Sequence, residues 1–130
     1  MPSTRPFLVH SLIRFILGAA LAVAAMTSAW AHHGWTWAEE GNSELTGVIT
    51  AVRLGNPHGE LTLDVNGATW TVEVGQPWRN ERAGLKDPML AKGVKLTVSG
   101  HRHADPQKKV FKAERIFIDG KKFDLYPERD

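Results

Sequence analysis

Two adjacent histidines, His32 and His33, follow a segment with the features of a cleavable export signal. Ala29 and Ala31 place small residues at the −3 and −1 positions of a cleavage site, so a cut after Ala31 makes His32 the first residue of the processed chain. A terminal histidine offers its free amine and an imidazole nitrogen to one metal ion. Copper(II) favours such nitrogen donors and tops the divalent affinity order. These residues predict a copper site at the processed amino terminus.

This terminal histidine resembles the histidine brace of exported copper proteins, which include periplasmic copper carriers and copper-dependent polysaccharide monooxygenases. The resemblance covers only the terminal residue, and those proteins have different sandwich folds. It implies copper as the metal, and it leaves the fold to be argued from the rest of the chain.

Three further histidines are candidate ligands. His58 follows Asn56-Pro57, where the proline stiffens the loop, and His101 and His103 are two residues apart, so that they project to the same side of a strand. In the predicted site His32 supplies the amine and an imidazole, His58 completes the square, and His33 or His101 is the fourth or axial ligand. Zinc is the alternative metal, and its tetrahedral preference favours a different set. That set is His33, His58, His101 and His103.

Residues 1–31 have the three parts of a secretory signal peptide. Arg5 and Arg14 form the basic region, and Phe15–Ala25 is an apolar run shorter than the roughly 20 residues that span a bilayer. We therefore expect cleavage, a periplasmic location and no stable membrane insertion afterwards. A cut after Ala29 is the alternative.

The composition limits the kind of partner. The chain has 16 basic and 14 acidic residues, and removal of Arg5 and Arg14 with the signal peptide leaves the two charges balanced. Balanced charge argues against nucleic acid as a partner. The chain has no cysteine, so no disulfide can stabilise it in an oxidising compartment. Residues 32–130 suffice for one small domain.

An N-terminal arm rich in His and Trp, residues 32–43, is expected to precede a β domain over residues 44–130. Val48, Val52 and Leu54 alternate along one face of the first strand, and Trp70, Val72 and Val74 are predicted to face inward in the third. Asn66-Gly67 and Asp119-Gly120 predict tight hairpins. The expected strands cover residues 44–54, 60–65, 68–74, 94–99, 110–118 and 122–126.

The order of these elements indicates the fold. A short helix at residues 80–85, with a further turn at Asp87-Pro88, separates three strands from the remaining ones. This is the order of the five-stranded OB-type barrel, and Gly47 suits a first strand that bends to serve both sides of a barrel. We therefore predict an all-β, OB-like barrel of five to six strands with one short helix. A β-sandwich is the alternative, although its usual seven strands are hard to fit.

Tryptophans provide a second hypothesis for function. Trp35, Trp37 and Trp78 are candidates to line a surface on which an OB-type module binds a small molecule, glycan or protein partner without metal. Nucleic acid is not expected there, because the strands carry acidic residues. Those residues are Glu60, Asp64 and Glu73.

The sequence resembles an uncharacterised family, a domain of unknown function, of small exported bacterial proteins. The residues that carry the resemblance are His32-His33-Gly34, Asn56-Pro57-His58, Trp70 to Glu73, Gly93–Val98, Gly100-His101-Arg102 and Asp119-Gly120. The resemblance covers nearly the whole processed chain. It implies no activity, but it singles out His32, His33 and His58 as positions that match the family pattern.

We expect a periplasmic protein that binds copper for buffering or delivery, with a copper-handling periplasmic or membrane protein as its partner. Catalysis is not expected, because the sequence has no cysteine nucleophile, no glycine-rich phosphate loop and no Gly-x-Ser-x-Gly motif. A copper-dependent oxidase or monooxygenase is a third hypothesis, and it requires an open coordination position on an exposed face.

Overall fold

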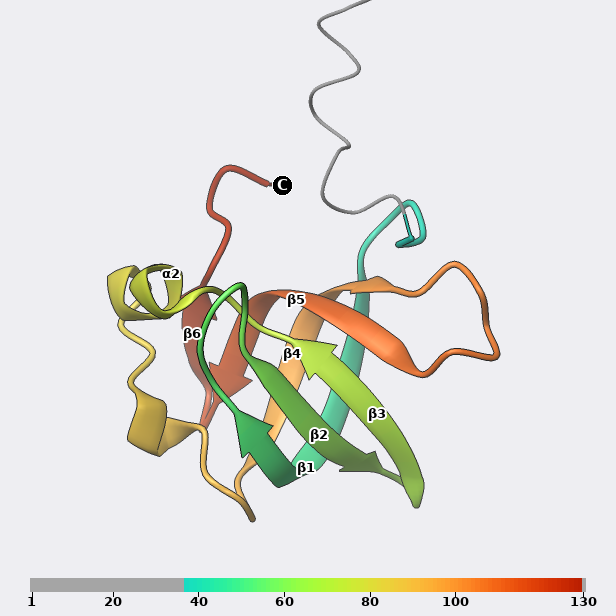
Figure 1. Cartoon of the computed structure of the whole chain (residues 1–130), viewed down its shortest axis with the longest axis horizontal. Coiled ribbons are helices and arrows are strands. Elements are labelled where there is room, and N and C mark those ends of the chain that lie inside the picture. Colours follow the sequence, from blue (N-terminus) through green and yellow to red (C-terminus); the bar gives the residue numbers. More distant parts are fainter. Residues whose placement is uncertain (1–36, 130) are drawn as a thin grey trace, which may run out of the picture. The chain divides into compact units, whose positions relative to one another are not determined.

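The computed structural model of the chain describes residues 37–129, which form a small β-barrel (Figure 1). The predicted signal peptide and the arm residues up to Thr36 lie outside this range. One short helix, α2, and one 3-10 turn follow the third strand. The elements are β1 (Ser43–Arg53), β2 (Glu60–Val65), β3 (Ala68–Glu73), α2 (Pro77–Arg82), the 3-10 turn (Asp87–Met89), β4 (Lys95–Arg102), β5 (Val110–Ile118) and β6 (Lys121–Asp124).

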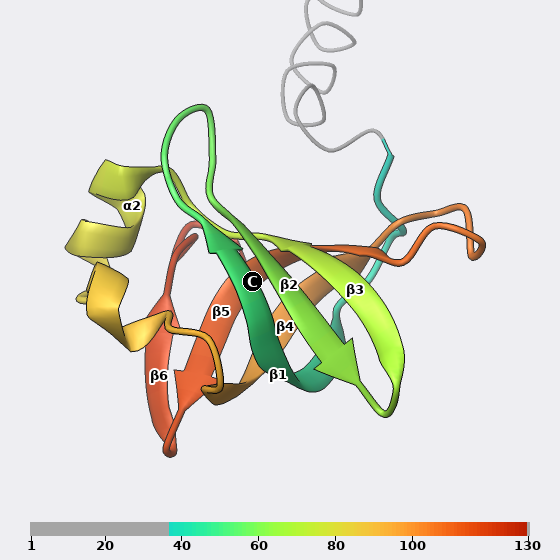
Figure 2. The same ribbon diagram turned by 60° about the horizontal axis from the view of Figure 1, so that its bottom comes forward.

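The strands close into a ring. β1 pairs with both β2 and β4, β2 pairs with β3, and β4 pairs with β5, all antiparallel. A parallel pairing of β3 with β5 completes the barrel, and β6 extends the sheet beyond β5 (Figure 2). This five-stranded closed barrel with one additional strand and one short helix confirms the predicted OB-like architecture.

The turn between β2 and β3 sets the register of that hairpin. Asn66 and Gly67 both have positive φ, 52° and 84°, as a two-residue type I′ turn requires. Val65 therefore pairs with Ala68, and the register continues to the far end, where Glu60 lies opposite Glu73.

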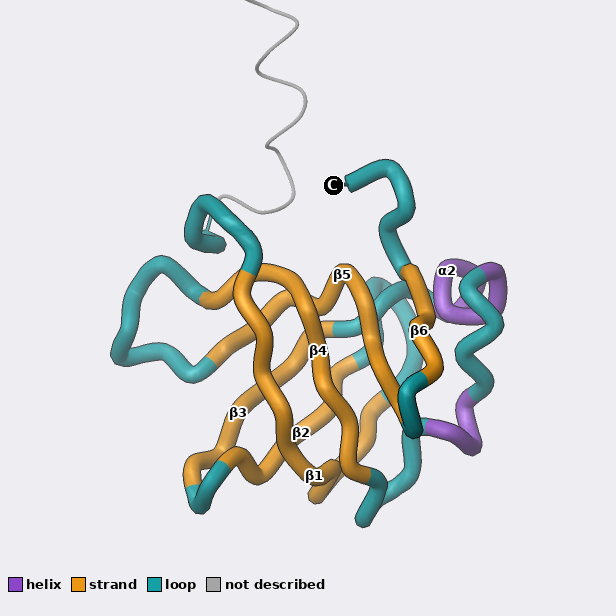
Figure 3. Tube along the Cα trace, turned by 180° about the vertical axis from the view of Figure 1, so that it is seen from behind, coloured by secondary structure: helices purple, strands orange, loops and turns teal. Residues whose placement is uncertain are grey.

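Alternate residues of the strands fill the barrel. Leu61 and Leu63 of β2 and Val72 of β3 are fully buried, while Glu60 and Glu73 point outward. In the view from behind, β4 and β5 lie in front of β2 and β3, on the opposite side of the barrel (Figure 3). The buried hydrophobic residues are Leu45, Ile49, Leu61, Leu63, Val72, Val74, Leu85, Leu90, Leu96, Val98, Phe111, Ala113, Ile116, Phe123 and Leu125.

The alternating apolar face noted for the first strand, which carries Val48 and Val52, is not its core face. Leu45 and Ile49 are buried, whereas Val48 lies opposite Asp64 and is 38% exposed, as is Val52. Leu45, Gly47 and Ile49 alternate along the buried face of β1, and Val48 lies on the opposite face. The pairing with β2 becomes irregular only between Ile49 and Ala51, where this alternation ends.

Gly47 is required by a close approach between β1 and β2. A Cβ atom at this position would lie 2.6 Å from the carbonyl oxygen of Asp64. Gly47 also pairs with Leu96 of β4, so it lies where β1 serves both neighbouring strands, as predicted.

The short helix lies earlier than predicted. It covers Pro77–Arg82 rather than residues 80–85, because Pro77 fits the first turn of a helix, where its missing N–H is not needed. Gly84, with a φ of 79°, follows the helix end. Within residues 37–129 no helix is long and apolar enough to cross a membrane.

Candidate metal site

His58, Glu60 and Glu73 form the group of potential ligands that the fold brings together within the described residues. Their ligand atoms all lie within 4.8 Å of one another, and all three residues are partly buried. His58 Nε2 is 3.5 Å from Glu73 Oε1. One imidazole nitrogen and two carboxylate oxygens are a donor set that zinc and copper(II) accept.

The β2–β3 hairpin positions the two carboxylates. Its register places Glu60 directly opposite Glu73, and both side chains lie on the outer face because their neighbours Leu61 and Val72 fill the core. Residues directly opposite in an antiparallel pair have Cβ atoms about 4.5–5.5 Å apart. The strand pairing therefore brings the two carboxylates close together whether or not a ligand is bound.

The loop before β2 brings His58 beside these carboxylates. Gly59 donates its N–H to the carbonyl of Gly75 and accepts a hydrogen bond from Val74 N, at 3.2 and 2.9 Å. A Cβ atom on Gly59 would lie 2.8 Å from Val74 Cγ2, so the residue must be small. The Asn56–Pro57 peptide bond in this loop is cis. These contacts hold His58 at the end of β3, next to Glu73.

Two cations flank the carboxylates. Lys112 Nζ lies 3.5 Å from Glu73 Oε2, and the guanidinium of Arg53 pairs with the carboxylate of Glu60. Lys112 is the residue of β5 that pairs with Glu73 across the parallel β3–β5 contact. Like charges directly opposite in a sheet repel, and these cations offset that repulsion.

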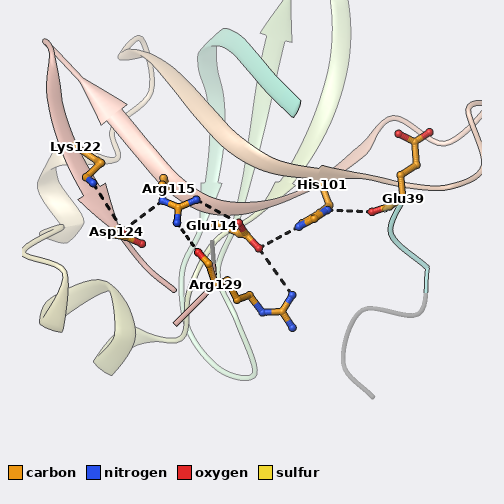
Figure 4. Close-up of polar contacts among 7 residues, drawn as sticks. All are labelled: Glu39, His101, Glu114, Arg115, Lys122, Asp124 and Arg129. Carbon is orange, nitrogen blue, oxygen red and sulfur yellow. Dashed lines mark hydrogen bonds and ion pairs between the residues drawn. The ribbon is translucent and has the colours of Figure 1, made fainter. Parts of the chain in front are cut away.

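The ring of His101 contacts Glu39 and Glu114. Nδ1 is 3.0 Å from the carbonyl oxygen of Glu39, and Nε2 is 3.1 Å from Oε1 of the buried Glu114 (Figure 4). Each ring nitrogen therefore faces an oxygen atom of another residue. Metal coordination by His101 requires one of these contacts to break. His101 fastens the end of the arm to the barrel.

His103 lies in a different environment. Its Nδ1 accepts a hydrogen bond from Asp105 N at 2.9 Å, and its ring stacks on Trp37 with ring centroids 5.2 Å apart. Neither His103 nor His101 belongs to the group formed by His58, Glu60 and Glu73. The described part of the chain thus brings one of the three internal candidate histidines to the carboxylates.

The remaining predicted site residues do not join this group within the described part of the chain. His32, His33 and Trp35 lie outside residues 37–129. Trp37 packs against His103, whereas Trp78 in α2 is 51% exposed and lies against the guanidinium groups of two neighbouring residues. Those residues are Arg79 and Arg82, at 4.7 and 5.3 Å from the ring centroid.

Glu60 and Glu73 are not among the ligands expected from the sequence, where they count only as acidic residues that oppose nucleic-acid binding. A signal for them is nevertheless present, because a two-residue Asn66-Gly67 turn fixes which residues of the flanking strands face each other. Counting outward from that turn places Glu60 opposite Glu73, two residues beyond a loop histidine.

The comparisons identify a family and a set of distant structures. A family model described as "Family of unknown function (DUF6152)" matches residues 20–111, which confirms the resemblance to a family of unknown function. The search of curated proteins found no match.

Three solved structures are similar to the barrel. One is the S. pombe Stn1-ten1 complex, at 15% identity and a TM-score of 0.48, covering 59% of this chain and 57% of that one. Another is the ZRD-deleted mutant of TiaS in complex with agmatine, at 16% identity and a TM-score of 0.48, covering 65% and 26%. The third is a complex of TiaS with a tRNA and ATP, at 19% identity and a TM-score of 0.45, covering 59% and 18%. The matched part spans less than two thirds of each of these chains.

Proposed function

The chain belongs to this family of unknown function, and we propose that it is an exported protein that binds a divalent transition-metal ion through His58, Glu60 and Glu73. The observation that carries the proposal is the position of three ligand atoms within 4.8 Å of one another, on side chains that are all partly buried. Partial burial strengthens the attraction between a cation and the carboxylates relative to an exposed acidic patch.

Copper(II) is the metal that we propose first. Among divalent first-row ions it has the highest affinity for nitrogen and oxygen donors, and it accepts a planar set completed by further nitrogens. Zinc is the alternative, since one histidine and two carboxylates leave a fourth tetrahedral position for another ligand. In either case the site on the barrel is incomplete, and a further ligand from the chain or from solvent must complete it.

The processed amino terminus is the further ligand in this proposal. Trp37 is anchored to the barrel by its ring contact with His103 and by its carbonyl, which accepts from Ala104 N at 2.8 Å. In this proposal His32, exposed by removal of the signal peptide, supplies its amine and imidazole beside His58.

We propose binding, buffering or delivery in the periplasm, with a copper-handling protein of the periplasm or membrane as the recipient. The two tryptophans of the described range that were candidates for a binding surface, Trp37 and Trp78, pack against different neighbours, one on the β4–β5 side and one on α2. These two tryptophans therefore do not support a shared aromatic groove, and the proposal does not use one. The metal-free binding module becomes the better explanation if metal binding fails.

The test is a competitive titration of the exported, processed protein with copper(II) and zinc against a chelator of known affinity, after mass spectrometry has established its first residue. His58→Ala, Glu60→Gln and Glu73→Gln should each weaken binding at least tenfold. His103→Gln and Glu81→Gln, which change a histidine and a carboxylate outside the group, are the matched controls. Unchanged affinity in His58→Ala would overturn the proposal.

A second comparison separates the terminal ligand from the barrel ligands. A protein that begins at His32 is titrated beside one extended by a single alanine, whose peptide bond removes the amine from the site. Tighter binding by the authentic form supports the role of His32. Equal binding by both forms, with His58→Ala still weakened, restricts the site to the barrel and overturns the terminal part of the proposal.

A further inference from the structure

Lys112 is almost completely buried, with 5% of its surface exposed. Lysine is among the residues least often buried, because an ammonium group that leaves water requires a partner of opposite charge. Glu73 is such a partner, with its Oε2 at 3.5 Å from Lys112 Nζ. Lys112 is thus a buried cation in contact with one ligand of the proposed metal site.

The two oxygens of Glu73 face different partners. Oε1 is 3.5 Å from His58 Nε2, on the side of the ligand group, and Oε2 is directed to Lys112. A carboxylate held in this way presents one oxygen to a metal and keeps the other in a charge-assisted contact. Groups that hold a ligand from behind determine its orientation and affect which metal it binds.

We infer that Lys112 is a positioning residue that restricts Glu73 to a single metal-binding oxygen and thereby makes the site selective for copper(II) or zinc over calcium and magnesium. The inference rests on the proposed function and specifies the class of metal ion. Calcium takes six to eight oxygen ligands and often uses both oxygens of one carboxylate, and magnesium demands an octahedral oxygen shell. A site with one imidazole and single carboxylate oxygens supplies neither.

The ring of Tyr126 also lies near the ammonium group of Lys112. Nζ lies 5.7 Å from the centroid of the Tyr126 ring, and the guanidinium of Arg79 lies 4.1 Å from the same ring. Tyr126 thus packs against both cations. Lys112 has little freedom to follow Glu73 if that carboxylate turns both oxygens toward an ion.

The experiment compares Lys112→Met, which keeps the length of the side chain and removes its charge, with Lys112→Arg, which keeps the charge. Zinc affinity is measured by chelator competition and calcium affinity by displacement of terbium luminescence. The ratio of zinc to calcium affinity should fall at least tenfold in Lys112→Met and stay within about threefold of the wild type in Lys112→Arg. A purely structural role would lower both affinities together and leave the ratio unchanged, which would overturn the inference.

A second measurement applies if Lys112→Met does not fold. In the wild type, the nitrogen-15 signal of the Lys112 ammonium group should remain protected from exchange when zinc is added, because Glu73 keeps its contact through Oε2. Loss of that protection would overturn the inference. Failure of the wild type to bind either metal would refute the proposed function itself, whereas zinc binding with an unchanged ratio in Lys112→Met refutes only the role of Lys112.

Discussion

Glu60 and Glu73 lie directly opposite each other in the β2–β3 ladder, with both carboxylates on the outer face of the barrel. Such a pair of like charges is unfavourable unless cations or a bound ion balance it. The fold supplies Arg53 on one side and Lys112 on the other, and it places His58 within reach of Glu73. The pair therefore has a structural balance of charge together with an imidazole that can share a metal with it.

The two carboxylates should differ in their effect on the metal-free protein. Glu60→Gln removes repulsion and a largely exposed ion pair, so the free energy of unfolding should change by less than about 0.5 kcal/mol. Glu73→Gln removes a charge contact of the buried Lys112 and should cost about 3 kcal/mol. Urea unfolding in the presence of a chelator measures both values. Equal effects of the two substitutions would contradict the assignment of Lys112 to Glu73.

Gly100 should tolerate no side chain. It lies at the irregularity between β4 and β5, and a Cβ atom there would be 2.0 Å from the carbonyl oxygen of Lys112. We expect Gly100→Ala to destabilise the protein by about 2–4 kcal/mol, because backbone must move to relieve the overlap. Thermal unfolding compares it with Ser99→Ala on the same strand, which should have a much smaller effect. A stable Gly100→Ala protein would mean that the bulge can relax.

Glu114 should be essential for stability although it is not a proposed ligand. It is 1% exposed, and basic side chains from β4, β5 and the C-terminal segment surround it (Figure 4). Those groups are His101 at 3.1 Å, Arg115 at 3.5 Å and Arg129 at 3.8 Å. Glu114→Gln leaves them without their shared anion and should cost about 3–5 kcal/mol. Glu40→Gln, at an exposed position, is the control, and chemical denaturation measures both variants.

Glu128 should contribute stability that depends on pH. A backbone hydrogen bond lowers the pKa of its carboxyl most strongly, and Arg79 and Arg82 lower it further against an opposing effect of burial. A lowered folded-state pKa means that the contribution is present above the unfolded-state pKa and is lost as the pH falls through the folded-state value. Urea midpoints of the wild type and Glu128→Gln should therefore differ at pH 7 and converge in acid, below the lowered folded-state pKa of Glu128. A difference that persists unchanged in acid would refute the assignment.

Local patterns predicted most of the barrel. The β2 and β5 strands have the expected bounds, and the Asn66-Gly67 turn is where the sequence places it. These predictions succeeded because alternation and turn geometry are properties of neighbouring residues. The alternating apolar face noted for β1 is not its core face, since Leu45 and Ile49 alternate in the same way and only the pairing with β2 and β4 decides which set points inward.

In the candidate site, too, some contacts follow from local sequence and others only from the tertiary structure. The sequence by itself determines that Glu60 faces Glu73, because a two-residue turn fixes the hairpin register, and that His58 precedes them in the adjoining loop. Only the tertiary structure decided that Lys112 reaches Glu73, since β5 joins β3 through a parallel contact between segments far apart in the chain. It likewise directed His101 to Glu39 and Glu114 instead of His58. Closure of the barrel, which no local pattern encodes, selects the neighbours of each outward side chain and so determines which charges share one site.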